Sequence, residues 1–380
     1  MTHPIYLDHN ATTPVAPEVA QAILPFLYES FGNPSSSHAY GQEAARALAH
    51  ARGQVARLIG AEDDEILFTA NATEANNMAL LGVASAMENT SRRHMVVSAI
   101  EHPAVMQPAL QLRERGWEVS IVPVDTAGRV VVSSLAEVLR PDTALISIMH
   151  ANNEVGTIQP IAEIGRLARA RGILLHTDAA QSIGKIDVNV QALGVDLLSI
   201  AGHKAYAPKG IGALYVRRNT PLRSVLFGGE QERGLRPGTE NVAFSVGLGA
   251  AAELAQNRLS QSGPAMRRHR DALHAYLSTQ IPGLVFNGHP DERLPNTLNV
   301  SFPGVEGATL LASVPEVAAS TGSACHSGRR EVSGVLAAMS KSYEEASGAV
   351  RLSVGRGTTD EEVTRAAQGL IQAWHQLVAT

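Results

Sequence analysis

Short apolar runs alternate along the chain with longer segments in which apolar residues return every three or four positions. The short runs are rich in Val, Ile and Leu and predict buried strands, whereas the longer segments predict helices. We expect strands at residues 65–69, 94–99, 117–123, 143–149, 173–178, 196–201 and 211–216. This alternation indicates an α/β fold with a mainly parallel, seven-stranded sheet and helices on both faces.

The same pattern divides the chain into parts. A chain of 380 residues, 44% of them hydrophobic, is long enough for two domains. The turn-forming stretch Gln261-Ser262-Gly263-Pro264 indicates a boundary, and the segments beyond it indicate a small α+β domain with a helix at 266–281 and a last helix at 360–378. We therefore expect an N-terminal arm (1–15) that packs with the small domain, a large domain (16–262) and a small C-terminal domain (263–380) that carries a loop at 320–332.

Charge and composition exclude several classes of protein. The 36 acidic and 31 basic residues give a net charge of −5, which argues against a protein that binds nucleic acid directly. No apolar run approaches the roughly 18 residues that cross a bilayer, and the first residues lack the apolar core of a secretory signal, so we expect a cytoplasmic protein. The single cysteine, Cys325, excludes an intrachain disulfide, and no metal site is expected because no His-Glu-x-x-His spacing occurs.

Two predicted strands end on complementary chemical groups. The run at 173–177 leads to Asp178, and the run that ends at Ala201 is followed by Gly202-His203-Lys204. A lysine is more often a solvated surface charge, but loops after strand ends line the ligand crevice of open α/β sheets. Pyridoxal phosphate needs such a pair, because a lysine forms the Schiff base and a carboxylate holds the ring nitrogen protonated.

Other polar groups follow strands in the same way. Thr73 stands where the strand at 65–69 gives way to a helix, and the free N–H groups of a helix's first turn can hold a phosphate; the alternative is that Thr73 is a plain N-cap. His102 follows the strand at 94–99 and is either structural or able to move protons near pH 7.

The predicted small domain contains a thiol and a guanidinium group that could take part in the chemistry. Cys325 lies in the small, polar, glycine-bracketed segment 320–328, whose composition is that of a loop rather than a core element. His326, Arg329 and Arg330 would lower the pKa of its thiol and so favour a reactive cysteine over a structural one. Further on, Arg351 has the planar guanidinium that suits two-point contact with a carboxylate.

In order along the chain, these features resemble the cysteine desulfurases, which are fold-type I pyridoxal-phosphate enzymes of the class V aminotransferase group. The residues that carry the resemblance are Thr73, His102, Asn153, Asp178, Gln181, His203, Lys204, Cys325 and Arg351. The resemblance implies that pyridoxal 5'-phosphate is held by Ala72, Thr73, His102, Asn153, Asp178, Gln181, His203 and Lys204. It also implies a homodimer in which Thr239 binds the phosphate of the partner subunit's cofactor, and a substrate site formed by Asn33, Asn153 and Arg351.

The activity that the resemblance implies is the conversion of L-cysteine to L-alanine. Lys204, His102 and Cys325 would be the catalytic residues, and Cys325 would take the sulfur as a persulfide. The sulfur would then pass to an acceptor protein, such as an iron–sulfur scaffold or a tRNA-thiolation enzyme.

Two features leave alternatives open. Ala201 stands where the family usually has a serine that binds phosphate, so we expect a lower cofactor affinity through the loss of one hydroxyl. The segment Ala324-Cys325-His326 also resembles selenocysteine lyases, which release selenium from L-selenocysteine. A further alternative is a catalytically silent sulfur-relay or docking protein that has kept the fold.

Overall fold

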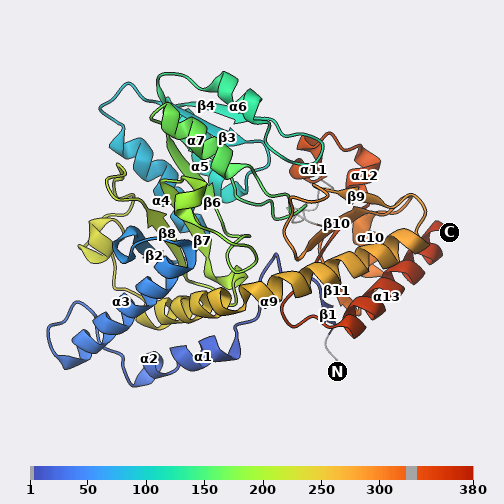
Figure 1. Ribbon diagram of the computed structural model, residues 1–380, viewed down its shortest axis with the longest axis horizontal. Coiled ribbons are helices and arrows are strands. Elements are labelled where there is room, and N and C mark those ends of the chain that lie inside the picture. The colour runs from blue at the N-terminus through green and yellow to red at the C-terminus, as the bar shows by residue number, and fades with distance from the viewer. Residues whose placement is uncertain (1–3, 322–331, 380) are drawn as a thin grey trace.

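The computed structural model describes residues 4–321 and 332–379. The large sheet with its helices lies on one side of Figure 1 and the smaller C-terminal part on the other. Helix α9 (Val242–Gln280) runs through both (Figure 1).

The large sheet has seven strands in the order β2-β8-β7-β6-β5-β3-β4. Strands β3 to β7 pair in parallel, whereas β8 is antiparallel to β7 and β2. The bounds are β2 (Ile66–Thr69), β3 (His94–Ser98), β4 (Glu118–Val122), β5 (Thr143–Ser147), β6 (Leu174–Asp178), β7 (Leu197–Ala201) and β8 (Gly212–Val216). The prediction of a mainly parallel seven-stranded sheet is confirmed.

Alternate side chains of each strand enter different cores. In β8, Ala213 and Tyr215 belong to one hydrophobic cluster, and Leu214 and Val216 belong to the other. The first cluster is covered by α1 (Pro17–Ile23), α3 (Ala39–Ile59), α6 (Val132–Val138), α7 (Ile161–Ala170), α8 (Val190–Leu193) and part of α9, and the second by α4 (Ala72–Ala86) and α5 (Pro103–Glu114). Because both faces are covered, these strands read as continuous apolar runs rather than alternating ones.

The small part has its own sheet and core. Its antiparallel strands lie in the order β12 (Ala349–Ser353), β10 (Thr297–Ser301) and β9 (Val285–Asn287). Its helices are α10 (Gly307–Ala312), α11 (Gly334–Ala338), α12 (Tyr343–Ser347) and α13 (Asp360–Val378), and α13 lies beside α9 (Figure 1). The remaining short elements are α2 (Pro25–Tyr28) and the 3-10 turns η1 (Asp63–Glu65), η2 (Gly202–Lys204) and η3 (Gln231–Gly234).

The N-terminal arm belongs to the small part at its start and reaches the large part further on. Strand β1 (Ile5–Tyr6) pairs in parallel with β11 (Val317–Ala318), and Ile5 and Leu7 lie in the core of the small part. The backbone N–H of Thr13 then donates to the carbonyl of His203, 2.9 Å away. The arm therefore links the two parts close to Lys204.

The boundary expected at 261–264 is not a break in the backbone. Helix α9 continues for 39 residues across Gly263 and Pro264, where the prediction placed a boundary ahead of a helix at 266–281. A proline inside a helix removes one backbone hydrogen bond, but α9 packs on α3 and α1 before this point and on α13 after it. Packing on both sides thus outweighs the local preference for a break, and the two cores meet along one helix.

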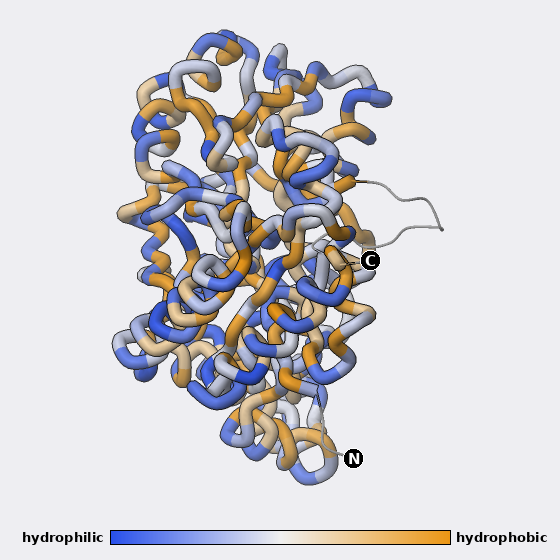
Figure 2. Tube along the Cα trace, turned by 90° about the vertical axis from the view of Figure 1, so that its right-hand side faces the viewer, coloured by the Kyte–Doolittle hydropathy of each residue, from blue (hydrophilic) through white to orange (hydrophobic). Residues whose placement is uncertain are grey.

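The distribution of hydropathy agrees with this layered arrangement. Figure 2 shows the hydrophobic segments mainly in the interior and the hydrophilic ones mostly at the outer turns. Within residues 4–321 and 332–379, no helix has the length and apolar character needed to span a membrane. The same residues contain no group of three or more His, Cys, Asp or Glu side chains that could hold a metal ion.

The arm's fit against the small part predicts a steric effect at Gly355. A Cβ atom at this position would overlap the ring of His9, whereas a Cβ at Gly357 would meet nothing within 4 Å. We expect Gly355→Ala to lower the free energy of unfolding by about 1–3 kcal/mol, because the ring and its arm must shift. The matched variant Gly357→Ala should leave it unchanged or raise it by up to about 1 kcal/mol. Urea denaturation of both variants measures the difference, and equal effects would contradict the proposed contact.

Candidate active site

A cavity of about 400 Å³ opens where strands of the large sheet end. It is lined from the large domain by residues after β2, β3, β5, β6 and β7, from the arm by Asp8, Asn10 and Ala11, and from the small domain by Ser320 and Arg351. Its volume lies within the range usual for a small ligand. Three separate parts of the chain therefore build one site.

Asp178 and Lys204 face this cavity from neighbouring strands. Asp178 is the last residue of β6. Because β6 pairs in parallel with β7, the two strands end at the same edge of the sheet. Lys204 is the last residue of η2, the single turn that follows β7. That turn requires Gly202, because a Cβ there would lie 2.8 Å from the carbonyl oxygen of Ile211. Lys204 is only partly exposed and lines the cavity, so it is not a solvated surface charge.

The Asp178 carboxylate is fixed by two donors. Asn76 donates from Nδ2 to Oδ2 at 2.7 Å, and the backbone N–H of Ala180 donates to Oδ1 at 2.9 Å. Asp178 is only 6% exposed, and Asn76 is fully buried on α4. The sequence did not single out Asn76, because nothing in its local pattern showed that α4 packs over the end of β6.

The pKa of Lys204 falls from its ordinary value to about 8. Burial is the main cause, since it disfavours the charged amine, and Asp178 opposes it. An amine with a pKa near 8 is partly uncharged at neutral pH. It can therefore act as a nucleophile and exchange protons, which an ordinary lysine does poorly.

The beginning of α4 presents free donors to the cavity. Its N-cap is Asn71, whose Oδ1 accepts from the N–H of Glu74 at 2.9 Å, so the alternative that Thr73 is the N-cap is wrong. Ala72 and Thr73 occupy the first turn and line the cavity together with Ala201 and His203. This end of the helix is suited to an anion such as a phosphate.

Two histidines line the cavity in their neutral forms. His102 is the N-cap of α5, and its Nδ1 accepts from the N–H of Ala104 at 3.1 Å. Burial lowers the pKa of His102, an effect that Lys204 reinforces and Asp178 opposes. Burial, reinforced by Lys204, also lowers the pKa of His203 to about 4. With Nδ1 of His102 accepting, the proton of the neutral ring lies on Nε2.

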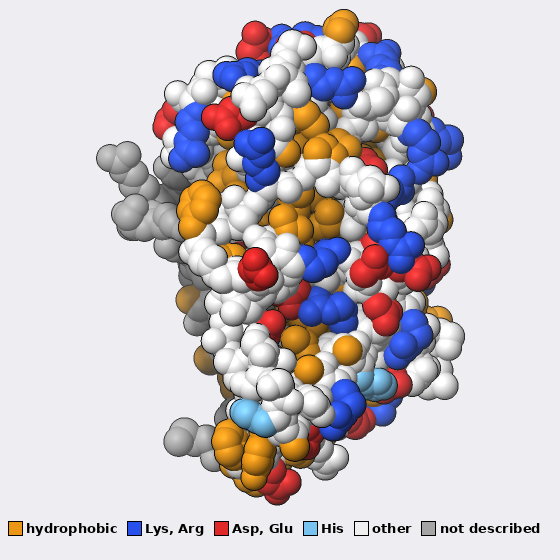
Figure 3. Space-filling model, turned by 90° about the vertical axis from the view of Figure 1, so that its left-hand side faces the viewer, with side chains coloured by type: hydrophobic (Ala, Val, Ile, Leu, Met, Phe, Trp, Pro, Cys, Tyr) orange, Lys and Arg blue, Asp and Glu red, His pale blue; other side chains and the backbone are white. Residues whose placement is uncertain are grey.

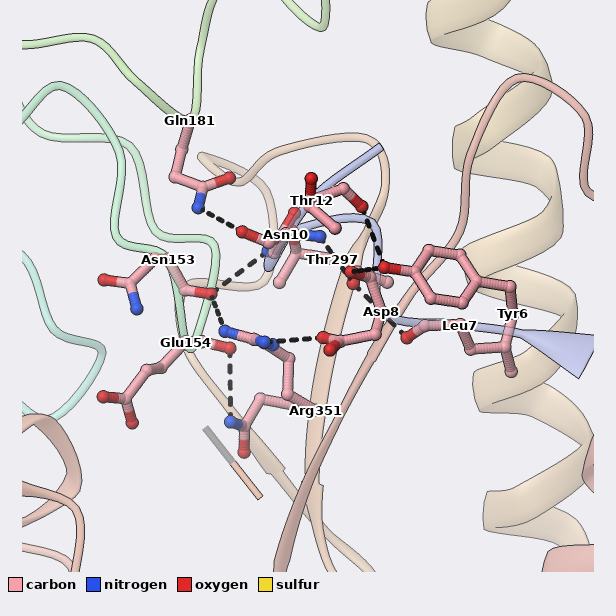
Figure 4. A network of polar contacts seen from close by, with 12 residues as sticks. Tyr6, Leu7, Asp8, Asn10, Thr12, Asn153, Glu154, Gln181, Thr297 and Arg351 are labelled. Carbon is pink, nitrogen blue, oxygen red and sulfur yellow. Dashed lines mark hydrogen bonds and ion pairs between the residues drawn. The ribbon is translucent and has the colours of Figure 1, made fainter. Parts of the chain in front are cut away.

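Asn10 joins the arm to the other walls of the cavity (Figure 4). Its Nδ2 donates to the carbonyl of Asn153 at 3.1 Å and to Oγ1 of Thr297 at 2.8 Å. The backbone carbonyl of Asn10 accepts from Nε2 of Gln181 at 3.0 Å. Asn10 is 1% exposed and was seen in the sequence only as part of a polar arm. It is thus a structural residue of the site that sequence reasoning missed.

A buried lysine stands behind Gln181. Lys185 donates from Nζ to Oε1 of Gln181 at 2.8 Å and to Oδ1 of Asn10 at 3.1 Å. Burial, followed by the charges of Lys204 and Arg351, lowers its pKa well below the ordinary value. Lys185 therefore fixes the orientation of the Gln181 amide, and one N–H of that amide remains for a ligand.

Arg351 reaches the cavity from β12. Nη1 donates to the carbonyl of Asn153 at 3.1 Å, and Nη2 forms an ion pair with Oδ1 of Asp8 at 2.6 Å (Figure 4). The residue is 5% exposed. The structure thus brings together Ala72, Thr73, His102, Asn153, Asp178, Gln181, His203, Lys204 and Arg351 around one cavity.

Three predicted site residues are not among those that line it. Asn33 is exposed, and its Oδ1 accepts from the N–H of Ser35 at 2.9 Å. Thr239 is also exposed, in the segment between η3 and α9. Cys325 lies outside the described residues. A single chain therefore places neither Asn33 nor Thr239 at Lys204.

The residues of the cavity fit pyridoxal phosphate by their chemistry. Asp178 offers a buried carboxylate for a protonated ring nitrogen, and Lys204 offers an amine for an aldehyde. The first turn of α4 offers N–H groups for the phosphate, and His102 offers a neutral ring on the same cavity.

Glu101, immediately before His102, is a buried acid close to this site. Its Oε1 accepts from Oγ of Ser98 at 2.5 Å and from the N–H of Met149 at 3.0 Å, and within the described chain Oε2 has no hydrogen-bond partner. Burial raises the pKa of Glu101 to about 8, and Asp178 adds to the rise. Glu101 is therefore largely protonated in the folded protein at pH 7.

Comparisons with known proteins agree with this reading. The family model for class-V aminotransferases matches residues 5–366. The cysteine desulfurase IscS of Dictyoglomus turgidum is 46% identical over 365 residues, which cover 96% of this chain and 92% of that protein. The cysteine desulfurase NifS of Azotobacter vinelandii is 45% identical over 364 residues, covering 95% and 90%. A solved structure of a NifS-like protein superposes with a TM-score of 0.92 at 38% identity, covering 99% of this chain and 100% of that chain.

The raised pKa of Glu101 predicts the effect of a neutral replacement. Between pH 4.5 and 8 the folded protein holds a proton on Glu101 that the unfolded chain releases, so this group lowers stability as the pH rises through that window. Glu101→Gln keeps the shape without the charge. We expect it to raise the free energy of unfolding by about 1–3 kcal/mol at pH 8 and to change it little below pH 4.5.

Urea denaturation at pH 4.5 and at pH 8 measures this effect. The exposed carboxyl of Glu137 on α6 provides the control, because Glu137→Gln should give no such dependence on pH. A difference between Glu101→Gln and the wild type that stays constant with pH would mean that Glu101 is ionised in the fold.

Proposed function

The chain belongs to the class-V aminotransferases and, within them, to the pyridoxal-phosphate-dependent cysteine desulfurases, and from this premise we propose a role for each residue of the cavity. The enzyme converts L-cysteine to L-alanine, and the sulfur passes to Cys325. The observation that carries the assignment is that Lys204, Asp178 and Arg351 face one cavity from three elements of the fold.

The cofactor supplies a ring that accepts electrons and so stabilises negative charge at Cα of the substrate. Asp178 aims its carboxylate into the cavity, because Asn76 and the N–H of Ala180 hold both oxygens. The first turn of α4, with Thr73 and His203, would hold the phosphate of the cofactor. Ala201 lines the cavity with a methyl group, so no hydroxyl from that position contributes.

Arg351 binds and orients the substrate. Its guanidinium is positive and 5% exposed, and a carboxylate is the anion that its fork fits. Asn153 helps to position the guanidinium, since the backbone carbonyl of Asn153 accepts from Nη1 of Arg351. A carboxylate held there places the substrate between Arg351 and Lys204.

Lys204 moves the proton at Cα. Its pKa near 8 allows the amine to take a proton and return it near neutral pH. His102 is a second group for proton movement, because burial keeps its ring neutral and it lines the same cavity.

Cys325 accepts the sulfur. Its thiolate attacks the sulfur of L-cysteine, and the S–S bond forms as the Cβ–S bond breaks. The electron pair of the broken bond stays on the carbon skeleton, Cβ takes up a proton, and the products are L-alanine and a Cys325 persulfide. Support comes from chain length, because Ser320 lines the cavity five residues earlier and five residues span at most about 17 Å. The persulfide then passes to a sulfur-acceptor protein in the cytoplasm, and an iron–sulfur scaffold fits the relatives named IscS and NifS.

We further propose that the enzyme is a homodimer in which Asn33 and Thr239 serve the partner's site. Large exposed hydrophobic side chains gather near α2 and the beginning of α3, namely Leu24, Leu27, Tyr28, Phe31 and Tyr40. The hydrophobic side chains at the lower edge of the face in Figure 3 belong to the same end of the molecule as α2. Phe227, on the segment that leads toward Thr239, is 95% exposed. Exposed apolar side chains of this size favour contact with another subunit.

The transfer of sulfur to Cys325 is tested by weighing the protein. After incubation of the holoenzyme with L-cysteine, we expect a gain of one sulfur on the Cys325 peptide and release of L-alanine, measured by mass spectrometry. Cys325→Ser should show neither the gain nor sustained alanine release, while it keeps the absorbance of the bound cofactor. Alanine release at the wild-type rate without the gain would instead support a lyase.

The position of Thr239 in the dimer is tested with mixed dimers. If Thr239 serves the partner's cofactor, a heterodimer of Lys204→Ala and Thr239→Ala chains has one site with both changes and one intact site. We expect such purified heterodimers to show about half of the wild-type activity, above that of either mutant homodimer. Activity no greater than half that of the Thr239→Ala homodimer would place Thr239 in the site of its own chain.

A further inference from the structure

The backbone of Arg351 is held rigidly in the small domain. On β12 it lies opposite Asn299 of β10, and on its other side its backbone exchanges hydrogen bonds with Ser320 at 2.7 and 3.3 Å. Both sides of the strand are therefore paired at this residue. The guanidinium enters the cavity from a fixed position and does not swing in with a loop.

The guanidinium has an unusual set of partners for a group that must take an incoming anion. Nη2 is paired with Oδ1 of Asp8 at 2.6 Å, and Nη1 donates to the carbonyl of Asn153 at 3.1 Å. Nε is buried and, in the part of the chain that the structure describes, has no hydrogen-bond partner. A two-point grip on a carboxylate uses either Nε with Nη2 or Nη1 with Nη2. Both grips use Nη2, and Asp8 already occupies one of its two N–H groups, so an incoming carboxylate would lie directly against the carboxylate of Asp8.

We propose that Asp8 is an internal counterpart of the substrate carboxylate, which pairs with Arg351 in the free enzyme and is displaced from Nη2 when the substrate binds. This inference deepens the proposed function and rests on the assignment of Arg351 as the carboxylate-binding residue. Asp8 then sets the affinity for the substrate and rejects ligands that bind Arg351 too weakly to displace it.

The arm is built so that only the side chain of Asp8 has to move. The backbone of Asp8 forms a β-bridge with Ser353, and the backbone carbonyl of Asp8 accepts from Oη of Tyr6 at 3.1 Å. The preceding residue, Leu7, accepts from the N–H of Ser353 at 2.7 Å and donates to the carbonyl of Ala318 at 2.8 Å. The Asp8 side chain is nevertheless 22% exposed, whereas that of Arg351 is 6% exposed. A rotation toward solvent therefore frees Nη2 while the backbone stays in place.

The charges in the cavity favour exchange over joint binding. Two carboxylates on one guanidinium would repel each other in a site with little water. In the free enzyme, Asp8 also supports the charged form of Lys204, since it raises the pKa of that amine. A substrate carboxylate bound to Arg351 would place a negative charge at a similar distance from Lys204 and so support the charged form of the amine in the same way. Exchange thus leaves the balance of charge around Lys204 nearly unchanged.

The size of the effect follows from competition. If Asp8 occupies Arg351 for about nine-tenths of the time, only about one-tenth of the enzyme is ready for a carboxylate, and the apparent dissociation constant is about tenfold higher. Removal of the Asp8 charge should therefore tighten carboxylate binding. A residue that merely held Arg351 in place would have the opposite effect when removed.

The experiment uses the holoenzyme with Asp8→Asn, which keeps the shape, and with Asp8→Ala, which removes the side chain. Propionate serves as a probe that carries a carboxylate but neither amine nor thiol. We expect KM for L-cysteine and the inhibition constant of propionate to fall about 3- to 10-fold in both variants. Calorimetric titration with propionate should show the same tightening without turnover.

Two further variants separate the possible failures. Glu18→Gln removes a carboxylate that pairs with Arg258 at 2.8 Å at the exposed beginning of α1, and it should change neither constant. Arg351→Lys should weaken propionate. If it does and the Asp8 variants leave propionate binding unchanged or weaker, Asp8 only positions Arg351 and the present inference is overturned. If Arg351→Lys leaves KM and propionate inhibition unchanged, the assignment of Arg351 itself fails.

Discussion

The site depends first on the hydrogen bonds that Asn10 makes between the N-terminal arm and both domains. Its side chain reaches Asn153 of the large domain and Thr297 of the small domain, and its carbonyl holds Gln181. Asn10 is only 1% exposed. If it moved, each of these groups would lose a hydrogen-bond partner at a place that water does not reach. The relative position of Lys204 and Arg351 is therefore fixed through a residue that takes no part in the chemistry.

Burial then shifts the pKa of several groups in and beside the cavity. It lowers the pKa of Lys204 and Lys185, keeps His102 and His203 neutral, and leaves Glu101 protonated near pH 7. Asp178 and Asp8 remain as the carboxylates that face the cations, one held by Asn76 and one paired with Arg351. This arrangement gives an amine that exchanges protons near neutral pH and a guanidinium that faces the cavity, where it can bind an anion.

Much of the fold could be predicted because it depends on local pattern. Continuous apolar runs gave the strands, and the parallel arrangement brought Asp178 and Lys204 to one edge of the sheet. The prediction differed from the structure where packing outweighs local preference, as at Pro264 inside α9. The sequence also left open whether Thr73 is the N-cap of α4, since Asn and Thr are both suitable for that position, and only the geometry shows that the N-cap is Asn71.

The sequence by itself determined which reactive groups follow which strands, because side-chain chemistry and strand order are local properties. It indicated the lysine, the acid that faces it, the arginine and the fold that gathers them. Only the tertiary structure decided that Asp8 pairs with Arg351, that Lys185 lies behind Gln181 and that Asn76 holds Asp178. Each of these contacts joins residues from different elements, and the protonation of each group follows from burial, which no short stretch of sequence contains.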